Sequence, residues 1–244
     1  MGWGIGAVLA TYLVAAAVKG MTGLGFSTTC LPFLAFIVGL KEALPLVIVP
    51  SVASNIVVMV GAGRFYETVI RFRMMLAMTA IGVMLGLWTL ASVSGTEAGA
   101  ALGVILLVWC LFSLLNPSLG VPAHWEKPLQ PASGLLTGLV NGVTGSQVFP
   151  VVPFLMMLRL ERNLFIQAVN CSFTLSSLIM MVGLSRLGLV TTDAIVLSAA
   201  GVLVIFFGLR AGERIRGHLS PERFRIAVLL VLMAMGVSLL ASAF

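Results

Sequence analysis

Charged residues are scarce in this sequence. Only 9% of its 244 residues are Asp, Glu, Lys or Arg, whereas 60% are apolar, and the mean hydropathy is +1.15. A soluble domain needs charges on roughly a quarter of its residues to cover its surface. A water-soluble protein is therefore excluded, and we expect the chain to lie in a lipid bilayer.

Acidic residues are absent from the long apolar runs. Asp193 is the only aspartate, and no carboxylate falls inside a run long enough to span the bilayer. The three cysteines, Cys30, Cys110 and Cys171, lack the spacing of metal ligands or of a disulfide framework. An enzyme needs positioned acids, bases or metals, and an intramembrane cation site needs carboxylates. We therefore expect no enzymatic activity, no catalytic residue, no metal site and no cofactor.

A basic surface is also missing. The net charge of +6 is modest, and most of it lies in loops. Binding of nucleic acid would need a basic face on a folded soluble surface, so we expect no nucleic-acid partner. In a membrane protein, Lys and Arg in short loops instead mark the cytoplasmic side. The chain begins without the basic stretch of a cleaved signal peptide, so we expect none.

Ten apolar segments fill the sequence, five on each side of one long linker. The linker, residues 116–131, contains four prolines and divides the chain into halves at 1–115 and 132–244. Uniform apolarity, without alternation of apolar and polar residues, favours helices over the strands of a membrane barrel. The expected segments are 3–18, 24–40, 43–63, 74–94, 98–115, 132–141, 147–158, 163–184, 194–211 and 226–243.

A glycine motif occurs once in each half. Gly20-Met21-Thr22-Gly23 returns as Gly142-Val143-Thr144-Gly145, 122 positions later, and each copy leads to a Pro-Phe-Leu. Further short matches follow in the same order, such as Gly86-Leu87 with Gly208-Leu209. Several matches in one order indicate that the two halves arose by duplication.

The second half is expected to be inverted relative to the first. Segments 132–141 and 147–158 are too short to span a bilayer, so each half is interpreted as a re-entrant helical hairpin followed by three transmembrane helices. The number of crossings per half is then odd, as inverted repeats require. The chain is thus predicted to be an all-α polytopic membrane protein with two inverted-topology repeats and both termini outside. Basic residues place these loops in the cytoplasm: 64–73, 116–131, 159–162 and 210–225.

Both glycine motifs are expected to break the helices at mid-membrane. A half-helix that starts there points unpaired N–H groups and the positive end of its dipole at the centre, which favours an anion. Neutral hydroxyl and amide groups surround both breaks, and Lys19 is the one cation beside the first. The candidate residues for binding a small anion are Lys19, Thr22, Gly23, Ser27, Thr28, Asn55, Asn141, Thr144, Gly145, Ser146, Gln147 and Asn170.

Each of these residues also has an ordinary structural explanation. Gly and Thr are common where transmembrane helices pack closely, and Asn often joins two helices by hydrogen bonds. A lysine near the end of an apolar run often extends to the membrane surface. Two copies of the motif at matching positions favour a site over packing, whereas a direct role of Lys19 stays open.

Three stretches of the sequence carry a family pattern. They are Gly20–Phe26 running to Pro32-Phe33-Leu34, Asn141–Gly145 running to Pro153-Phe154-Leu155, and a tail made of Gly208–Ile215 and Leu219–Arg225. With these motifs the chain resembles the sulfite exporter TauE/SafE family of membrane transporters along nearly its whole length. It departs from the family pattern where a glycine run is expected, at Ser27-Thr28-Thr29 and Ser146-Gln147.

The resemblance implies a secondary transporter of the bacterial inner (plasma) membrane and, with less support, a homodimer. Its substrates would be small sulfur-containing anions, such as sulfite, sulfoacetate or other short organosulfonates, usually moved outward. The expected mechanism is alternating access around a midplane site. Two alternatives remain open. One is an anion channel with the same site, and the other is a membrane-embedded enzyme or assembly factor, which would need a charged or metal-binding cluster at membrane depth.

Overall fold

The computed structural model describes residues 4–115, 120–215 and 221–242, and every regular element in these ranges is a helix. The predicted all-α class is therefore confirmed. Residues 116–119 of the predicted linker and 216–220 of the predicted loop 210–225 lie outside the described residues, as do the first residue of segment 3–18 and the last of segment 226–243.

Each predicted segment corresponds to one α-helix. The first half contains α1 (Ile5–Thr22), α2 (Phe26–Val38), α3 (Leu40–Ala62), α4 (Phe65–Arg71), α5 (Arg73–Ser92) and α6 (Gly95–Leu115). The second half contains a 3-10 turn η1 (Ala123–Trp125), then α7 (Glu126–Thr144), α8 (Val151–Met157), α9 (Arg162–Arg186), α10 (Thr192–Ile215) and α11 (Pro221–Ala241). Only α4, which lies in the predicted loop 64–73, has no counterpart among the expected segments.

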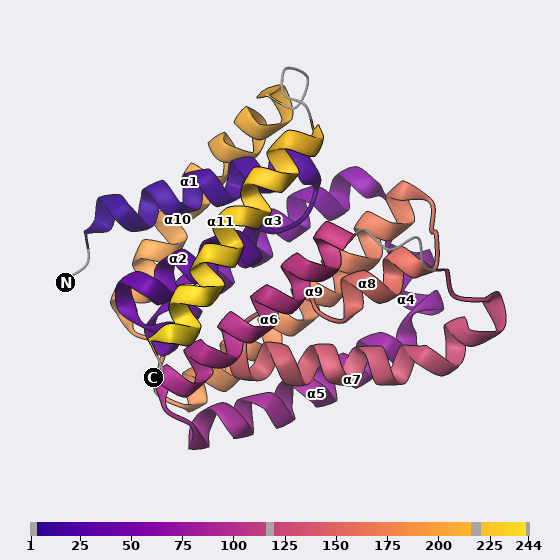
Figure 1. Ribbon diagram of the computed structural model, residues 1–244, viewed down its shortest axis with the longest axis horizontal. Helices are drawn as coiled ribbons and strands as arrows, with labels where there is room; N and C mark the ends of the chain where they lie inside the picture. The colour runs from indigo at the N-terminus through magenta and orange to yellow at the C-terminus, as the bar shows by residue number, and fades with distance from the viewer. Residues whose placement is uncertain (1–3, 116–119, 216–220, 243–244) are drawn as a thin grey trace.

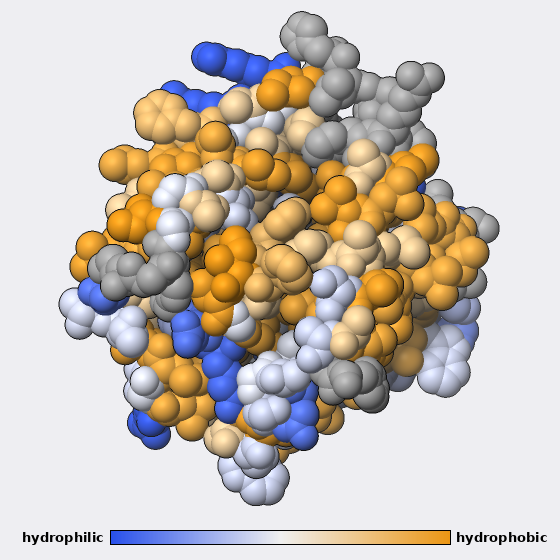
Figure 2. All heavy atoms as spheres, turned by 60° about the vertical axis from the view of Figure 1, so that its left-hand side comes forward, coloured by the Kyte–Doolittle hydropathy of each residue, from blue (hydrophilic) through white to orange (hydrophobic). Residues whose placement is uncertain are grey.

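The chain is a multi-pass membrane protein. Within the described ranges, six helices are long and apolar enough to cross a bilayer, namely α1, α3, α5, α6, α9 and α10. α2 and residues 225–241 of α11 form shorter apolar helices. Large apolar side chains point outward from these helices, for example Trp88 and Leu203. Apolar residues accordingly dominate the face drawn in Figure 2. Such a surface is stable against lipid tails and not against water.

The helix that leads into each glycine motif is longer than the sequence pattern predicted. α7 begins at Glu126, six positions before the expected segment 132–141, and has 19 residues. Pro128 does not prevent this, because it lies in the first turn, where a helix has no use for the missing N–H. Pro131 lies inside the helix, which continues past it. Likewise α1 has 18 residues and is long enough to span a bilayer by itself. Among the described helices that match an expected segment, only α2, with 13 residues, and α8, with 7, have the length of half-helices.

The halves are interlocked through parallel helix pairs. α7 packs along α5, with Gly134 against Met75 and Gly138 against Thr79, so positions rise together along both helices. In the same way α1 packs along α10, and Gly201 lies against Tyr12. Figure 1 shows α5 and α7 side by side along the lower edge and α1 beside α10 at the upper left. The first helix of each half therefore packs on a long helix of the other half.

Two further pairs join equivalent helices of the two halves. α6 and α11 run antiparallel, because Gly103 lies against Gly236 while Ser113 accepts a hydrogen bond from Arg225. α3 also packs on α9. When each helix is replaced by its equivalent in the other half, the same set of helix pairs results. A two-fold axis perpendicular to the helices, relating the two halves, would require this. An antiparallel pair of equivalent helices supports the inverted repeat, whose placement across the membrane stays a prediction.

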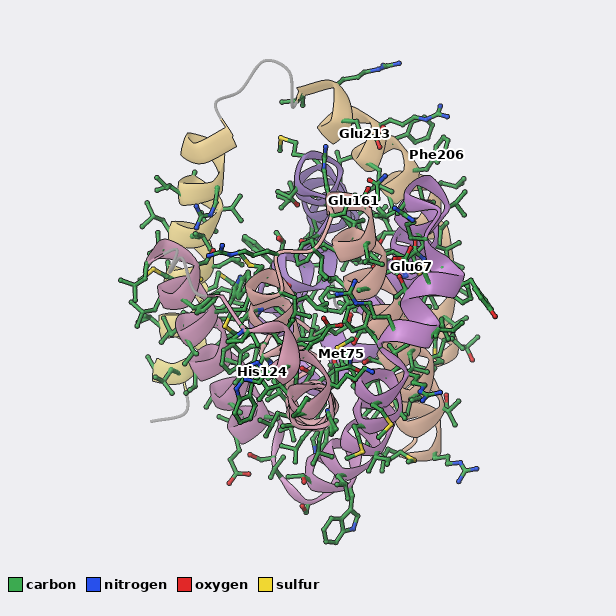
Figure 3. All side chains as sticks on the ribbon, turned by 90° about the vertical axis from the view of Figure 1, so that its right-hand side faces the viewer. Glu67, Met75, His124, Glu161, Phe206 and Glu213 are labelled. Carbon is green, nitrogen blue, oxygen red and sulfur yellow. The ribbon has the colours of Figure 1, made fainter. Side chains whose placement is uncertain are left out.

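Ion pairs connect the halves at the end of the molecule where α4 lies. Arg64 donates to Glu67 at 2.9 Å and to Glu161, which precedes α9, at 2.5 Å. The two glutamates are labelled in Figure 3, on α4 and at the start of α9. Arg71 donates through two nitrogens to the carboxylate of Glu126, at 2.7 and 2.8 Å. All three loops that contribute these residues belong to the predicted cytoplasmic side.

Candidate functional site

The first glycine motif ends α1. Gly23 has φ +80° and its N–H donates to the carbonyl of Lys19 at 2.7 Å, which is the left-handed cap that a glycine adopts without a steric penalty. The hydroxyl of Thr22 donates to the carbonyl of Val18 at 2.9 Å and accepts from the N–H of Leu24 at 3.2 Å. The threonine and the second glycine of the motif thus terminate the helix together.

The second motif ends α7 with the same geometry. Gly145 has φ +75° and donates to the carbonyl of Asn141 at 2.7 Å. The hydroxyl of Thr144 donates to the carbonyl of Val140 at 2.7 Å and accepts from the N–H of Ser146 at 3.1 Å. The sequence repeat is therefore a repeat of local structure, and it places Lys19 and Asn141 at equivalent positions.

The first glycine of each motif has a different role, because it permits close packing. A Cβ atom on Gly20 would lie 2.2 Å from the carbonyl oxygen of Leu209 in α10, and one on Gly142 would lie 2.5 Å from that of Val83 in α5. Neither position has room for a side chain. The two motif ends are consequently held against the opposite half of the chain.

Lys19 is buried at the first break and has neutral partners. Its side chain is 1% exposed, and Nζ donates to Ser54 Oγ at 3.2 Å and to Asn55 Oδ1. None of the ion pairs among the described residues includes Lys19. Lys19 does not extend to the membrane surface, so that ordinary explanation is excluded. A buried ammonium without a counter-charge is costly, and an anion beside it would remove much of that cost.

Asn141, the equivalent residue at the second break, has unused hydrogen-bonding capacity. Its side chain is 1% exposed, and neither its amide nitrogen nor its amide oxygen has a partner. Ser176 and Ser177 on α9 stand 122 positions after Ser54 and Asn55. Ser177 accepts from Gln147 Nε2 at 2.7 Å, whereas the hydroxyl of Ser176 is unpartnered. The second break is therefore neutral and incompletely hydrogen-bonded.

A small cavity lies where the second break meets α2, α3 and α9. Its volume is about 10 Å³, room for about one water molecule but not for an oxyanion. Five of the lining residues are polar, five are apolar and one is a glycine. The residues are Ser27, Leu31, Leu44, Val47, Ile48, Ser51, Asn141, Gly145, Gln147, Ser177 and Met180.

The structure brings some of the predicted site residues together. Ser27, Asn141, Gly145 and Gln147 line the cavity, and Ser27 shares a 2.7 Å hydrogen bond with Ser51. Lys19 and Asn55 contact each other one helical turn further along α3. The remaining predicted residues lie around the breaks without lining the cavity: Thr22, Gly23, Thr28, Thr144, Ser146 and Asn170.

Two of these residues have visible structural roles. Thr22 and Thr144 hydrogen-bond within their own helix ends, and Thr22 is exposed, whereas Thr144 is 2% exposed. Asn170 donates to the carbonyl of Ile166 at 2.8 Å, and its amide oxygen has no partner. The two threonines therefore stabilise the helix ends at the breaks, while the amide oxygen of Asn170 can still accept a hydrogen bond.

The candidate binding residues predicted from the sequence did not include Ser51, Ser54 or Ser177. Ser54 accepts from Lys19, and the other two line the cavity. A signal for Ser177 was available, because the 122-residue shift that aligns the glycine motifs also carries Asn55 onto Ser177. Serines are small and frequent in transmembrane helices, so only this alignment distinguishes them from packing residues.

Comparison with protein-family models matches residues 8–239 to the family described as Sulfite exporter TauE/SafE. Searches among curated proteins and among solved structures gave no match. The family match spans nearly all of the 244 residues and includes both glycine motifs, both breaks and the cavity at the second break. The chain therefore belongs to the sulfite exporter TauE/SafE family of membrane transporters.

Proposed function

We propose that this protein is a secondary transporter that moves small sulfur-containing anions, such as sulfite, sulfoacetate or other short organosulfonates, out of the cell across the bacterial inner membrane. Family membership supports the transporter class and the sulfur-containing substrate. The observation that carries the proposal is the buried ammonium of Lys19, whose partners are two neutral oxygen atoms.

An anion is the ligand that the surroundings of Lys19 lack. Lys19 is surrounded by the hydroxyl of Ser54 and the amide of Asn55, which orient the ammonium but do not neutralise it. A sulfonate or sulfite oxygen would add a charge-assisted hydrogen bond, which is about twice as strong as a neutral one. Lys19 is thus assigned the counter-charge of the bound anion.

Alternating access fits the small volume of the cavity better than a continuous pore does. A cavity of about 10 Å³ has no room for an oxyanion, so a substrate enters only when the helices around it move. In the proposed cycle the two interlocked halves rock against each other and expose the site to one side at a time. A channel would instead need an open path through the same region.

The proposed orientation follows from the basic loops. The loops 64–73, 116–131, 159–162 and 210–225 would lie in the cytoplasm, with both termini outside. In Figure 1, α1 begins and α11 ends on the left, and α4 lies on the opposite side of the molecule. That arrangement is compatible with both termini lying on the same side of the membrane. We also propose a homodimer, for which the family resemblance is the only support.

The proposal is tested by anion flux into proteoliposomes that contain the purified protein. Sulfite, sulfoacetate, taurine and a carboxylate analogue are supplied in turn. We expect Lys19→Met to lower sulfonate uptake tenfold or more, because it deletes a charged hydrogen bond. Lys19→Arg, which keeps the charge, should retain part of the uptake. Lys127→Met is the matched control, because it deletes an exposed positive charge on α7.

Two outcomes would contradict the proposal. If no sulfur-containing anion is bound or moved, or if Lys19→Met transports like the unchanged protein, the assigned site is wrong. Flux that ignores counter-substrate on the opposite side and exceeds carrier rates would identify a channel. Acceleration of uptake by internal substrate would instead be the sign of a carrier.

A further inference from the structure

The two ends of the proposed site differ in charge. Lys19 and Asn141 occupy equivalent positions, since each accepts the capping hydrogen bond of a motif glycine at 2.7 Å. One position is a cation and the other a neutral amide. A substrate held between them therefore meets one anion-selective end and one uncharged end.

Asn141 needs a ligand group that both donates and accepts. Its buried amide lines the cavity, and both its nitrogen and its oxygen are unpartnered. A sulfonate or carboxylate oxygen only accepts, and an ammonium only donates, whereas a hydroxyl does both. Because Asn141 lacks a partner on either atom, this requirement does not depend on which way its amide is turned.

The two ends are about one turn of α3 apart, judged from the residues of α3 beside each end. Ser51 lines the cavity, and Asn55, the partner of Lys19, follows four residues later on α3. Four residues of helix rise about 6 Å. Sulfite is too short to reach both ends, while an anion with a two-carbon spacer has a suitable length. Apolar side chains beside this path, such as Leu31 and Met180, are suited to contact methylene groups.

From these observations we infer that Asn141 recognises a terminal hydroxyl and that the preferred substrate is a short hydroxyalkanesulfonate. Because the cavity of about 10 Å³ has no room for these groups, this placement belongs to the opened site. There the sulfonate would lie at Lys19, the two methylene groups along the apolar lining, and the hydroxyl against both amide atoms of Asn141. The inference rests on the proposed anion transport and makes Asn141 a specificity-determining residue. The main competitor for Asn141 is a water molecule, which the cavity can hold.

A matched set of ligands tests this inference. Binding of 2-hydroxyethanesulfonate, ethanesulfonate, sulfite and 3-hydroxypropanoate to the purified full-length protein is measured by titration calorimetry. We expect 2-hydroxyethanesulfonate to bind about tenfold more tightly than ethanesulfonate, because only its hydroxyl satisfies the buried amide. 3-Hydroxypropanoate has the same hydroxyl but a carboxylate, and it reports whether the charged end requires sulfur.

Variants at position 141 assign the preference to the amide. Asn141→Leu has a similar volume without polar atoms, and it should bind both sulfonates with the affinity that the unchanged protein has for ethanesulfonate. Asn141→Ser keeps a group that donates and accepts, so part of the preference should remain. The ligand comparison on the unchanged protein stands even if Asn141→Leu does not fold.

The outcomes separate this inference from the proposed function. Equal binding of the two sulfonates by the unchanged protein, or a preference that survives in Asn141→Leu, would show that Asn141 holds only water. Loss of all sulfonate binding in Lys19→Met would still support anion transport in that case. If no sulfonate binds at all, the proposed function itself is wrong.

Discussion

Lys19 and Asn141 hold the same place in two copies of one helix end. Each backbone carbonyl accepts a 2.7 Å hydrogen bond from a glycine four residues later, Gly23 or Gly145, which has a left-handed conformation. The side chains differ, because one is a cation with two neutral partners and the other an amide with none. The two helix ends thus share their backbone geometry and differ in side-chain chemistry.

The first prediction concerns the close-packed glycines. Gly20→Ala and Gly142→Ala should each destabilise the protein by about 1–3 kcal/mol, because the new methyl group would overlap a backbone carbonyl that cannot move aside easily. Thermal unfolding in detergent measures the effect. Gly61→Ala is the control, because nothing lies within 4 Å of its Cβ position, and it should be neutral or slightly stabilising. Equal melting temperatures for all three variants would refute this packing role.

The second prediction separates the two capping glycines. Gly23→Ala should lower the free energy of unfolding by about 1–2 kcal/mol, which is the cost of the left-handed conformation alone. The new Cβ would lie 3.6 Å from Ile166, an ordinary contact distance. Gly145→Ala should cost more, because its Cβ would also lie 2.3 Å from Leu44. Gly23→Asn should recover part of the loss, because Asn tolerates this conformation. Unfolding experiments that rank Gly23→Ala as the more damaging change would contradict the assignment.

The third prediction concerns pH. The hydrogen bonds from Arg71 lower the pKa of the Glu126 carboxyl. A lowered pKa in the folded state stabilises the protein above the unfolded value of about 4.3, and this contribution is lost as pH falls through the folded value. We expect Glu126→Gln to melt at a lower temperature than the unchanged protein at neutral pH, and the gap should narrow in acid. A gap that stays constant down to pH 3 would show that the ion pair does not contribute.

The fourth prediction concerns orientation in the membrane. Single cysteines replacing Tyr66 and Glu213 should react with a membrane-impermeant thiol reagent from the cytoplasmic side, and one replacing Thr96 only from outside. All three positions are exposed. The native Cys30, Cys110 and Cys171 are buried and should give little background. Reaction of the Tyr66 and Glu213 positions from opposite sides would exclude the inverted repeat.

Much of the fold follows from the sequence, because apolar runs in a membrane have little alternative to helices. The positions of all ten expected segments correspond to helices, and both breaks occur at the predicted glycines. Helix ends were less predictable. α7 can start at Glu126 because Pro128 is tolerated in the first turn of a helix. Arg71 also binds Glu126, and these two residues are 55 positions apart in sequence.

The candidate site was predictable only in part. The glycine motifs located both breaks, yet Thr22 and Thr144 are used within their own helices, and nothing local marks Ser177 as a cavity residue. Whether the Lys19 side chain reaches the membrane surface or the protein interior depends on its packing against α3. Its partner there, Ser54, is 35 residues away in sequence. Such contacts depend on tertiary structure rather than on a local pattern.

The exchanged pairing of α1 with α10 and of α5 with α7 has a consequence for how such a chain can originate. A half-length chain made of one repeat would leave the packing surface around Gly20 or Gly142 without its partner helix. Two copies could cover each other's surfaces only by inserting in opposite orientations. The contacts are those that an antiparallel pair of separate half-length chains would make, and joining the halves in one chain makes such a pairing independent of protein concentration.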